Sequence, residues 1–467
     1  MIASTPTTEP YAIQQNLAFE LPRVSPPHAA PSLIEELKAF RQFGQPTRLL
    51  TTRFASPGGH QTDVPTFVNE FWTAKQRQAS SLHEISYRAC FKPQLPRFFI
   101  ERLTQPGDLV YDPFMGRGTT PVEAALLGRV PLGNDANPLS TVFTRPRLHP
   151  PTLDQIEERL RAMPLDDPAD VPEDLLAFYH PETLRHISSL KKYLLAGART
   201  FLSAATSENR PASDSNRAAG GHIAADKNVR APNDPIDDWI AMVALNRLTG
   251  HSNGFFSVYT LPPNQAVSAR SQRKINERRN QTPPERDVIK IILKKSRQLL
   301  GDVDAAARDF LSKASVHARV FTGPANATPE IASNSVSLVV TSPPFLNVVQ
   351  YATDNWLRCW FLGIDPNKVQ LTVPRRLDDW QVAMTEVFRE LARILKPGGH
   401  VAFEVGEVHA GKTKLEEAVL PCGVAAGLEP VLVLINDQKF TKTANCWGVD
   451  NMAKGTNTNR IVLFRKS

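Results

Sequence analysis

The sequence predicts an α/β fold in which a mostly parallel sheet is interleaved with helices. Three observations predict this class. Residues 336–340 form a short apolar run typical of a buried parallel strand, and a proline-rich loop follows it. Residues 108–127 contain a second short strand, a glycine turn and a helix. Between residues 379 and 464 helical and strand patterns alternate, as they do when crossover helices connect strands.

The strand at 336–340 ends at a stiff loop that begins with Ser342, Pro343, Pro344 and Phe345. Two prolines cannot continue a central strand, because each lacks a backbone donor and has a fixed φ. The loop must therefore lie at the carboxyl edge of the sheet, where open α/β sheets bind ligands. Ser-Pro-Pro is also a common loop tripeptide, so this motif needs a second one beside it.

The strand at residues 108–112 supplies that second motif, because two glycines, Gly116 and Gly118, separate it from the next helix. Glycine permits a close approach of the backbone to a ligand, and the start of a helix offers free N–H groups to an anion. The spacing differs from the Gly-x-Gly-x-x-Gly of dinucleotide sites, so a nicotinamide cofactor is not inferred.

Together, Asp112-Pro-Phe-Met-Gly-Arg-Gly-Thr-Thr120 and Thr341-Ser-Pro-Pro-Phe345 resemble the S-adenosylmethionine-dependent amino-methyltransferases of DNA. Within that family they resemble the cytosine-N4 branch, which favours Ser-Pro-Pro-Tyr/Phe over Asp-Pro-Pro-Tyr. The resemblance covers residues 70–140 and 316–467. It implies a Rossmann-like class I methyltransferase fold with a mostly parallel seven-stranded sheet, S-adenosyl-L-methionine as cofactor, and no metal.

The resemblance also implies roles for individual residues. Ser342 and the Pro343 carbonyl would accept the hydrogens of the target amine, Pro344 would stiffen the loop, and Phe345 would stack on the base. Asp135, at the end of the following strand, would hold the cofactor ribose, although an Asp before Asn-Pro also forms turns. The expected cofactor-binding residues are Lys92, Asp112, Phe114, Gly116, Gly118, Thr119, Thr120, Asp135 and Asn326.

One position departs from the family pattern. After the strand at 316–321, the sequence is Thr322-Gly-Pro-Ala-Asn326, where the family usually has Gly-Asp-Ala. That Asp accepts a hydrogen bond from the adenine amino group of the cofactor, and Pro324 cannot. Either Asn326 or a backbone carbonyl substitutes for it, or cofactor binding is weaker.

The division of the chain follows from these motifs. A disordered tail is expected at 1–32, the cofactor-binding half of the methyltransferase domain at 33–142, and the catalytic half at 317–467. Residues 143–316 form a mainly helical insert outside the family pattern, with a flexible loop at 203–235. The insert is the expected target-recognition region.

The strongest signal in the insert is its charge. Between residues 270 and 300 there are ten Lys or Arg and three acids, while the whole chain has a net charge of +7 and a pI of about 9.2. Polar side chains such as Gln272 and Asn276 alternate with these cations, as expected of a surface that contacts phosphates and base edges. A solvated basic helix is the alternative. The expected DNA contacts are Arg270, Arg273, Lys274, Arg278 and Arg279.

The sequence therefore predicts a site-specific DNA methyltransferase that modifies the N4 amine of cytosine, with DNA as partner and a cognate restriction endonuclease left open. Adenine-N6 methylation, an RNA amino-methyltransferase and a catalytically silent nucleic-acid-binding protein are the alternatives. Four widely separated cysteines and the lack of a long apolar run favour a cytoplasmic protein without a membrane segment.

Overall fold

The computed structural model of the 467-residue chain describes most of its length. The described residues are 32–73, 79–87, 90–165, 171–205, 234–260, 266–344, 351–366, 369, 374, 376–405, 407–408, 413–437 and 458–467. The predicted tail at 1–32 lies almost entirely outside them, as does most of the predicted loop at 203–235. The ends of that loop were placed wrongly, because residues 203–205 belong to one helix and Pro235 begins the next.

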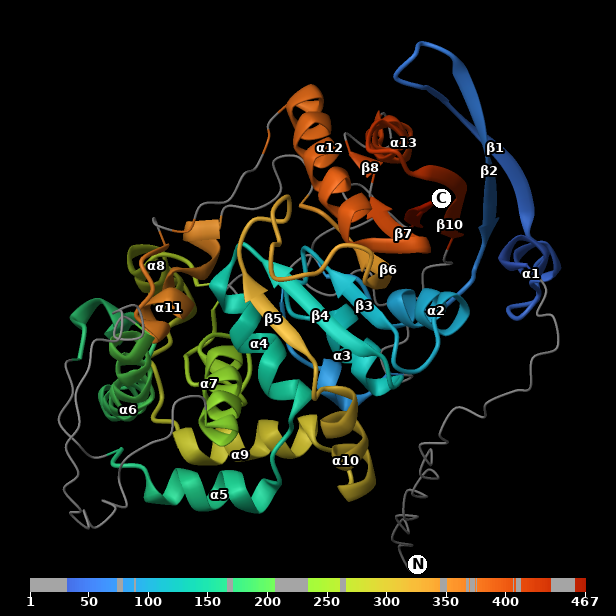
Figure 1. Ribbon diagram of the computed structural model, residues 1–467. Helices are drawn as coiled ribbons and strands as arrows, with labels where there is room; N and C mark the ends of the chain where they lie inside the picture. Colours follow the sequence, from blue (N-terminus) through green and yellow to red (C-terminus); the bar gives the residue numbers. More distant parts are fainter. Residues whose placement is uncertain are drawn as a thin grey trace, which may run out of the picture.

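A mixed sheet forms the centre of the molecule (Figure 1). Among the described residues it has nine strands in the order β1-β2-β10-β11-β7-β6-β3-β4-β5. The strands are β1 (Arg48–Ala55), β2 (Gln61–Asn69), β3 (Leu109–Asp112), β4 (Val130–Asp135), β5 (Arg319–Thr322), β6 (Val336–Thr341), β7 (Leu395–Val405), β10 (Glu429–Asp437) and β11 (Thr458–Arg465). A separate two-stranded sheet pairs β8 (Glu407–Val408) with β9 (Thr413–Lys414).

The seven strands from β10 to β5 correspond to the expected sheet. The sheet of the described residues nevertheless has nine strands, so the predicted number was too low. The hairpin β1–β2 extends the sheet, because β2 pairs in parallel with β10 over Thr66–Asn69 and Val433–Asn436. The five neighbours from β7 to β5 are parallel, whereas β11 is antiparallel to both β10 and β7. The hairpin β1–β2 lies outside the glycine and Ser-Pro-Pro motifs, so those motifs carried no signal for it.

Alternate residues of the strands pack on opposite faces of the sheet. Val339, Val401 and Phe403 face α12 and α13, whereas Leu338 and Ala402 face α1 and α2. This alternation follows from the two-residue period of a strand, and it makes every central strand apolar on both sides. The covering helices are α1 (Leu33–Ala39), α2 (Gln94–Leu103), α3 (Thr119–Leu126), α12 (Leu377–Ile394) and α13 (Leu415–Ala425).

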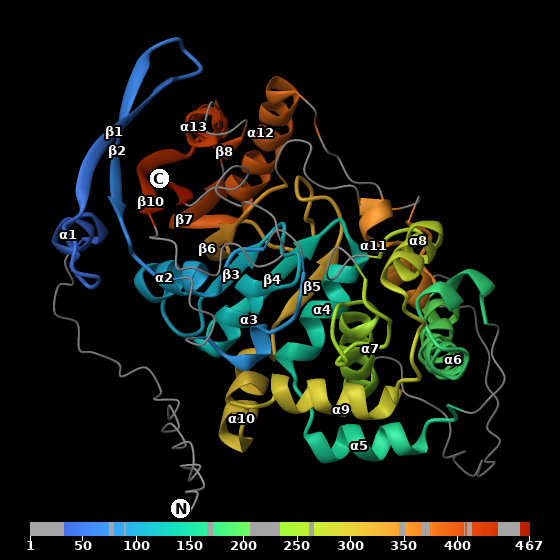
Figure 2. The same cartoon turned by 180° about the vertical axis from the view of Figure 1, so that it is seen from behind.

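The insert is helical, and it lies at the β5 end of the sheet, opposite the hairpin β1–β2; Figure 2 shows the same arrangement from behind. Its first helix crosses the predicted boundary at 142/143. The helices are α4 (Pro138–Leu148), α5 (Leu153–Ala162), α6 (Pro181–Ala205), α7 (Pro235–Arg247), α8 (Ala269–Arg279), α9 (Val288–Leu299) and α10 (Ala305–Ala314), with 3₁₀ turns η2 (Ser81–His83) and η3 (Glu173–Ala177), and α11 (Tyr351–Leu362) follows the Ser-Pro-Pro loop.

Candidate active site

The two sequence motifs meet at the carboxyl ends of adjacent strands. β3 pairs with β6, and the Asp112 carboxylate accepts a hydrogen bond from the Thr341 hydroxyl at 2.5 Å. The same carboxylate oxygen accepts the backbone N–H of Phe114 at 3.0 Å. Burial raises the pKa of Asp112 to about 7, even though these hydrogen bonds favour the ionised form. Asp112 therefore joins the glycine loop to the residue immediately before Ser342.

The glycine loop has the conformation that its sequence requires. Gly116 and Gly118 have positive φ angles of 52° and 79°, a region that favours glycine. A Cβ atom on Gly118 would lie 2.2 Å from the Thr144 hydroxyl oxygen, so only glycine fits beside α4. The Thr119 and Thr120 side chains are buried, and the Thr120 hydroxyl donates to the Val340 carbonyl at 3.0 Å. The hydroxyls of both threonines are thus directed into the protein, so their roles toward a cofactor stay predictions.

Asp135 lies at the carboxyl end of β4, beside the glycine loop. Its two carboxylate oxygens accept the backbone N–H groups of Gly116 and Asn137, each at 2.8 Å. Burial raises its pKa above the ordinary value. Because each oxygen has a further lone pair, this carboxylate can also accept the vicinal hydroxyls of a ribose. The residues at this edge therefore fit a nucleoside-containing cofactor.

The residues before α2 cover the glycine loop. We call residues 79–87 and 90–92 the covering segment. A Cβ atom on Gly116 would lie 3.6 Å from the Cys90 sulfur and 3.8 Å from the Tyr87 ring, so both side chains lie close to this glycine. The Tyr87 hydroxyl accepts the Asn137 amide at 2.7 Å. Lys92 is half-buried, and burial, with the nearby Arg117, lowers its pKa.

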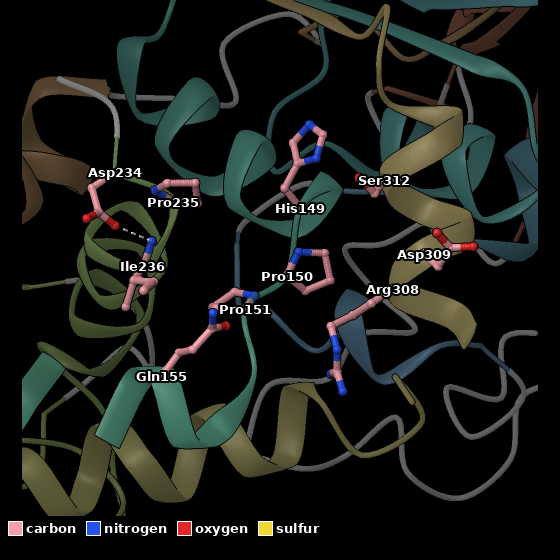
Figure 3. A pocket seen from close by; sticks show the side chains of 10 residues that line it. All are labelled: His149, Pro150, Pro151, Gln155, Asp234, Pro235, Ile236, Arg308, Asp309 and Ser312. Atoms are coloured by element: carbon pink, nitrogen blue, oxygen red, sulfur yellow. Dashed lines mark hydrogen bonds between the residues drawn. The ribbon is translucent and has the colours of Figure 1, made fainter. Parts of the chain in front are cut away.

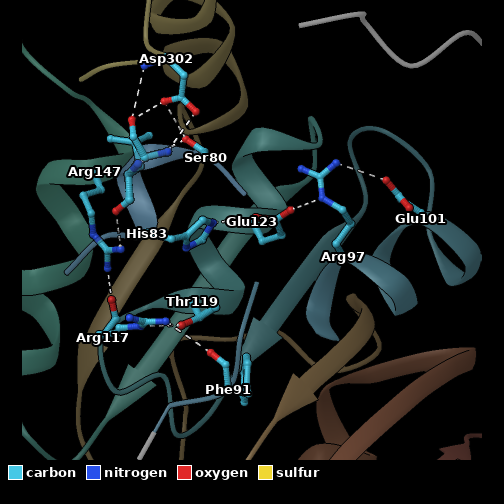
Figure 4. Close-up of polar contacts among 12 residues, drawn as sticks. Ser80, His83, Phe91, Arg97, Glu101, Arg117, Thr119, Glu123, Arg147 and Asp302 are labelled. Atoms are coloured by element: carbon cyan, nitrogen blue, oxygen red, sulfur yellow. Dashed lines mark hydrogen bonds and ion pairs between the residues drawn. The ribbon is translucent and has the colours of Figure 1, made fainter. Parts of the chain in front are cut away.

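A group of largely buried polar side chains connects the covering segment with α2, α3 and α4 (Figure 4). Arg117 donates to the carbonyls of Ile85 and Phe91, and its own carbonyl accepts from Arg147. His83 pairs with Glu123 of α3 at 2.7 Å, and Arg97 of α2 pairs with the other carboxylate oxygen.

Burial lowers the pKa of His83 despite its contact with Glu123, so its neutral form is favoured. Arg117 was part of the glycine motif in the sequence, but its role in holding the covering segment had no sequence signal, because its partners are backbone carbonyls.

The Ser-Pro-Pro loop is held rigidly where it leaves β6. Pro343 is buried, Ser342 and Pro344 are half-buried, and the Trp380 indole donates to the Pro344 carbonyl at 3.2 Å. Phe345 lies outside the described residues, so its predicted role stays a prediction.

Glu404 is a further functional candidate beside Ser342, and it was not predicted from the sequence. Glu404 lies near the end of β7, is 8 % exposed, and lies beside the Ser342 side chain, which favours its ionised form. Asn459 of β11 donates to its carboxylate at 2.8 Å. Burial raises the pKa of Glu404 above the ordinary value. The available signal was an acid within the otherwise apolar run at 401–405, which a buried strand does not tolerate without a partner.

Asn326, the expected substitute for the missing Asp, is exposed in the turn after β5. The structure instead places Asn134 of β4 against this turn, where its amide donates to the carbonyls of Gly323 at 3.0 Å and Pro324 at 3.3 Å. These carbonyls are backbone acceptors at the edge where the adenine amino group is expected. Whether Asn326 or a carbonyl accepts from the cofactor stays a prediction.

The basic segment, residues 270–300, is divided between two helices, α8 and α9. On α8, Arg270, Lys274 and Arg278 are exposed, while Arg273 pairs with Asp174 at 2.6 Å and the Arg279 guanidinium lies 3.8 Å from the centre of the Tyr259 ring.

The interpretation of Gln272 and Asn276 as base-reading side chains was wrong. Gln272 is buried, and the two amides bond each other and the backbone of Tyr259 and Ala177. These two polar residues, one helical turn apart, instead hydrogen-bond α8 to the neighbouring backbone.

A cavity of about 640 Å³ lies away from this edge (Figure 3). Its lining comes from the end of α4, the starts of α5 and α7, and α10, which precedes β5. It therefore lies toward the amino ends of the strands, and none of the predicted catalytic or cofactor residues contributes to it. In the described part of the chain, no group of three or more potential metal-ligating side chains gathers, and no helix is long and apolar enough to cross a membrane.

Comparisons with known proteins agree with this geometry. Residues 49–139 match the family described as DNA methylase. That match contains the hairpin β1–β2, the covering segment, the glycine loop and Asp135, whereas the Ser-Pro-Pro loop lies outside it.

Two curated relatives are type II methyltransferases. M.BsoBI of Geobacillus stearothermophilus is 22 % identical over 378 residues, which are 73 % of this chain and 63 % of the relative. M.MjaII of Methanocaldococcus jannaschii is 30 % identical over 91 residues, 19 % of this chain and 17 % of the relative. The chain therefore spans less than two thirds of the length of either relative.

Two solved structures align with this chain at low similarity. TTHA0409 of Thermus thermophilus, solved in complex with S-adenosyl-L-methionine, is 21 % identical over 29 % of this chain and 49 % of its own, with a TM-score of 0.17. The rRNA methyltransferase aviRa of Streptomyces viridochromogenes is 11 % identical over 85 % of this chain and 95 % of its own, with a TM-score of 0.31.

Proposed function

We propose that this chain is a site-specific DNA methyltransferase that transfers a methyl group to the N4 amine of cytosine. The cofactor would be S-adenosyl-L-methionine, the methyl donor implied by the resemblance, and the DNA methylase match covers all the residues expected to hold it except Asn326. The observation that carries the proposal is the contact of Thr341 with Asp112, which sets Ser342 directly beside the glycine loop and with Glu404 as its neighbour.

The residues of this edge would hold the cofactor in a defined orientation. Asp135 would accept the ribose hydroxyls, and Phe114 would lie against the cofactor with its half-buried ring. Lys92 and the rest of the covering segment would close the methionine end. Bound S-adenosyl-L-methionine supplies an electrophilic methyl group.

Ser342 and Glu404 account for the chemistry of the amine. The cytosine amine is a poor nucleophile because its lone pair is delocalised into the ring. When the Ser342 hydroxyl donates its hydrogen to the neighbouring Glu404 carboxylate, its oxygen lone pairs would be free to accept one amine hydrogen. The Pro343 carbonyl would accept the other, which directs the nitrogen lone pair toward the methyl group.

The proton of the product also has a destination. The nitrogen–methyl bond forms as the methyl–sulfur bond breaks, and the nitrogen becomes cationic. It then loses a proton to Ser342, whose own hydroxyl proton passes to the Glu404 carboxylate. Burial raises the pKa of Glu404, so this carboxylate accepts a proton more readily than an exposed one.

The target base must leave the duplex to reach this edge, and the exposed cations of α8 are the proposed phosphate contacts. The Trp356 indole of α11 donates to the Ala266 carbonyl at 2.9 Å, so the residues before α8 are joined to the helix that follows the Ser-Pro-Pro loop. The type II class of both relatives supports a role in restriction and modification, with a cognate endonuclease as the proposed counterpart.

The test is nucleoside mass spectrometry after incubation of the purified chain with labelled cofactor and mixed-sequence duplex DNA. N4-methylcytosine that disappears in Ser342→Ala is the expected result. N6-methyladenine would replace the proposed base with adenine. If the chain binds cofactor and methylates RNA alone, the DNA assignment is overturned.

A further inference from the structure

The covering segment has almost no regular secondary structure of its own. It contains the 3₁₀ turn η2, and its backbone bonds within the segment are limited to short turns such as His83 to Ser80 at 3.1 Å. A segment of this kind exposes carbonyl groups that must find other partners when buried. Here those partners are long side chains from distant parts of the chain.

Two of these side chains come from the insert. Lys295 of α9 donates to the Glu84 carbonyl at 2.7 Å, and Asn246 of α7 donates to the Ser86 carbonyl at 3.1 Å. Both donors are almost fully buried, at 6 % and 3 % exposed.

Further contacts hold the start of the segment to the same helices. Asp302, after α9, accepts the Ser81 N–H at 3.0 Å and the Ser80 hydroxyl at 3.2 Å. The Gln298 amide donates to the Glu84 carboxylate, and the Ser81 hydroxyl donates to the Leu299 carbonyl at 2.8 Å.

The apolar side chains of the segment follow the same division. Leu82 and Ile85 are completely or almost completely buried, and they belong to the core formed by the insert helices with α3 and α4. Phe71 and Trp72, which precede the segment, belong to a different core between the sheet and α2. The first part of the covering segment, with Leu82, Ile85 and Tyr87, is therefore packed as a part of the insert, although it lies more than 50 residues before the insert in the sequence, whereas Phe91 packs against the core of the sheet and α2.

The other side of the segment is directed at the glycine loop. Tyr87 is the next residue after the carbonyl that Asn246 holds, and its ring lies beside Gly116 while its hydroxyl accepts from Asn137. Any displacement of residues 84–86 would therefore move Tyr87 relative to Gly116 and Asp135.

We propose that Lys295 and Asn246 are positioning residues for the cofactor: the insert holds the covering segment over the glycine loop, and so forms one wall of the cofactor site. This inference rests on the proposed function for the identity of the ligand, S-adenosyl-L-methionine. It gives the insert a second role besides target recognition.

The helix α9 offers a matched pair of variants. Lys295→Met removes the buried donor but keeps an apolar stem of similar length, whereas Lys294→Met makes the same change at the exposed neighbouring residue. Asn246→Leu is an independent variant at the second donor. Loss of a hydrogen bond from a buried charged donor is expected to weaken cofactor binding about tenfold in Lys295→Met.

Three readouts on the full chain test the proposal. The first is the Kd for labelled S-adenosyl-L-methionine without DNA. The second is steady-state kinetics, which gives the KM for cofactor and kcat separately, together with the Kd for DNA. The third is amide hydrogen exchange of residues 79–92 in the absence of any ligand.

The expected result is a higher Kd and KM for cofactor, an unchanged kcat and DNA affinity, and faster exchange in the segment for Lys295→Met and Asn246→Leu. Lys294→Met should match the wild type throughout. If Lys295→Met and Asn246→Leu bind cofactor and exchange amide hydrogens as Lys294→Met does, the inference is overturned, even if these two variants unfold at a lower temperature. Failure of the wild type to bind cofactor would refute the proposed ligand instead, and the exchange data alone would then decide whether the insert holds the segment.

Discussion

The glycine loop and the covering segment lie on two sides of the same proposed cofactor site, yet they are held in place by different kinds of contact. Most contacts of the loop come from the adjoining strands: Met115 donates to Asn134 of β4, Gly118 donates to Met115 at 2.6 Å, and carboxylates at the ends of β3 and β4 accept its N–H groups. The covering segment is fixed by side chains 160 and 211 positions away, at Asn246 and Lys295.

This difference has a consequence for robustness. A loop fixed by its own turn and by paired strands forms whenever the sheet forms, because its contacts are those of the fold itself. A segment held by single buried donors depends on each of them, since a buried carbonyl that loses its only donor costs about 1–3 kcal/mol. Variants of the glycine loop and its strands should therefore change catalysis or stability, whereas variants of the buried donors should change the position of the covering segment.

The largest expected effect is on the sheet side, at Glu404. Replacing Glu404 with Gln removes the proposed proton acceptor but keeps a group that can bond with Ser342, so kcat for DNA methylation should fall about 10²–10⁴-fold. The Kd for cofactor should stay within about twofold of the wild type, since Glu404 lies beside Ser342 and not beside Asp135. Single-turnover kinetics measures the first quantity and equilibrium binding the second.

The control for this variant is Glu417→Gln, an exposed acid on the nearby helix α13 that pairs with Lys414 at the surface. It should retain full activity. The pH dependence gives an independent check. Because burial raises the pKa of Glu404, its protonated and inactive form persists above the ordinary pKa of 4.5. The wild-type rate should therefore fall with decreasing pH while still above pH 4.5, and this acid limb should be absent from the residual activity of Glu404→Gln.

The next effect is on stability, at Gly118. An alanine there would adopt an unfavourable φ of +79° and would place its Cβ against the side chain of Thr144, so we expect a loss of about 2–5 kcal/mol of unfolding free energy. Gly59, in the hairpin turn, has a similar φ of +78° but nothing within 4 Å of a Cβ, so Gly59→Ala should lose only about 1–2 kcal/mol.

Urea unfolding of both variants separates backbone strain from crowding. Equal losses would show that α4 yields at Thr144 and that close packing does not determine the loop.

The smallest effect per residue is expected on the insert surface. Replacing Arg270, Lys274 and Arg278 with Gln should reduce the slope of log K against log salt by about 0.9 for each phosphate that these side chains neutralise in the wild type. The control is Lys313→Gln on α10, a helix that lines the cavity at the amino ends of the strands, and it should leave the slope unchanged. A slope unaffected by the triple replacement would remove α8 from the proposed DNA surface. Cofactor affinity should not change, because the hydrogen bonds and ion pairs that tie α8 to other described elements go to Asp174, Ala177 and Tyr259 and not to the covering segment.

Much of the site could be predicted from the sequence because its parts are local. The apolar run at 336–340 and the strand at 108–112 each end in a motif whose glycines or prolines permit few conformations, and parallel strands bring such ends to one edge. The meeting of Asp112 with Thr341 follows from that rule. The two additional strands and the loop boundaries did not follow, because the hairpin β1–β2 and the ends of α6 and α7 lie outside the two short motifs on which the prediction rested.

What the sequence by itself determined was the class of fold and the two motifs, since strand period, turn chemistry and helix starts are properties of neighbouring residues, while S-adenosyl-L-methionine was implied by the resemblance of those motifs to a family. Only the tertiary structure decided that Glu404 lies against Ser342, that Gln272 and Asn276 are internal, and that Lys295 and Asn246 reach the covering segment. The physical reason is that a buried polar side chain is stabilised by its partner and not by its position in the chain, and these partners lie 62 to 211 residues away or across helix contacts that no short pattern specifies.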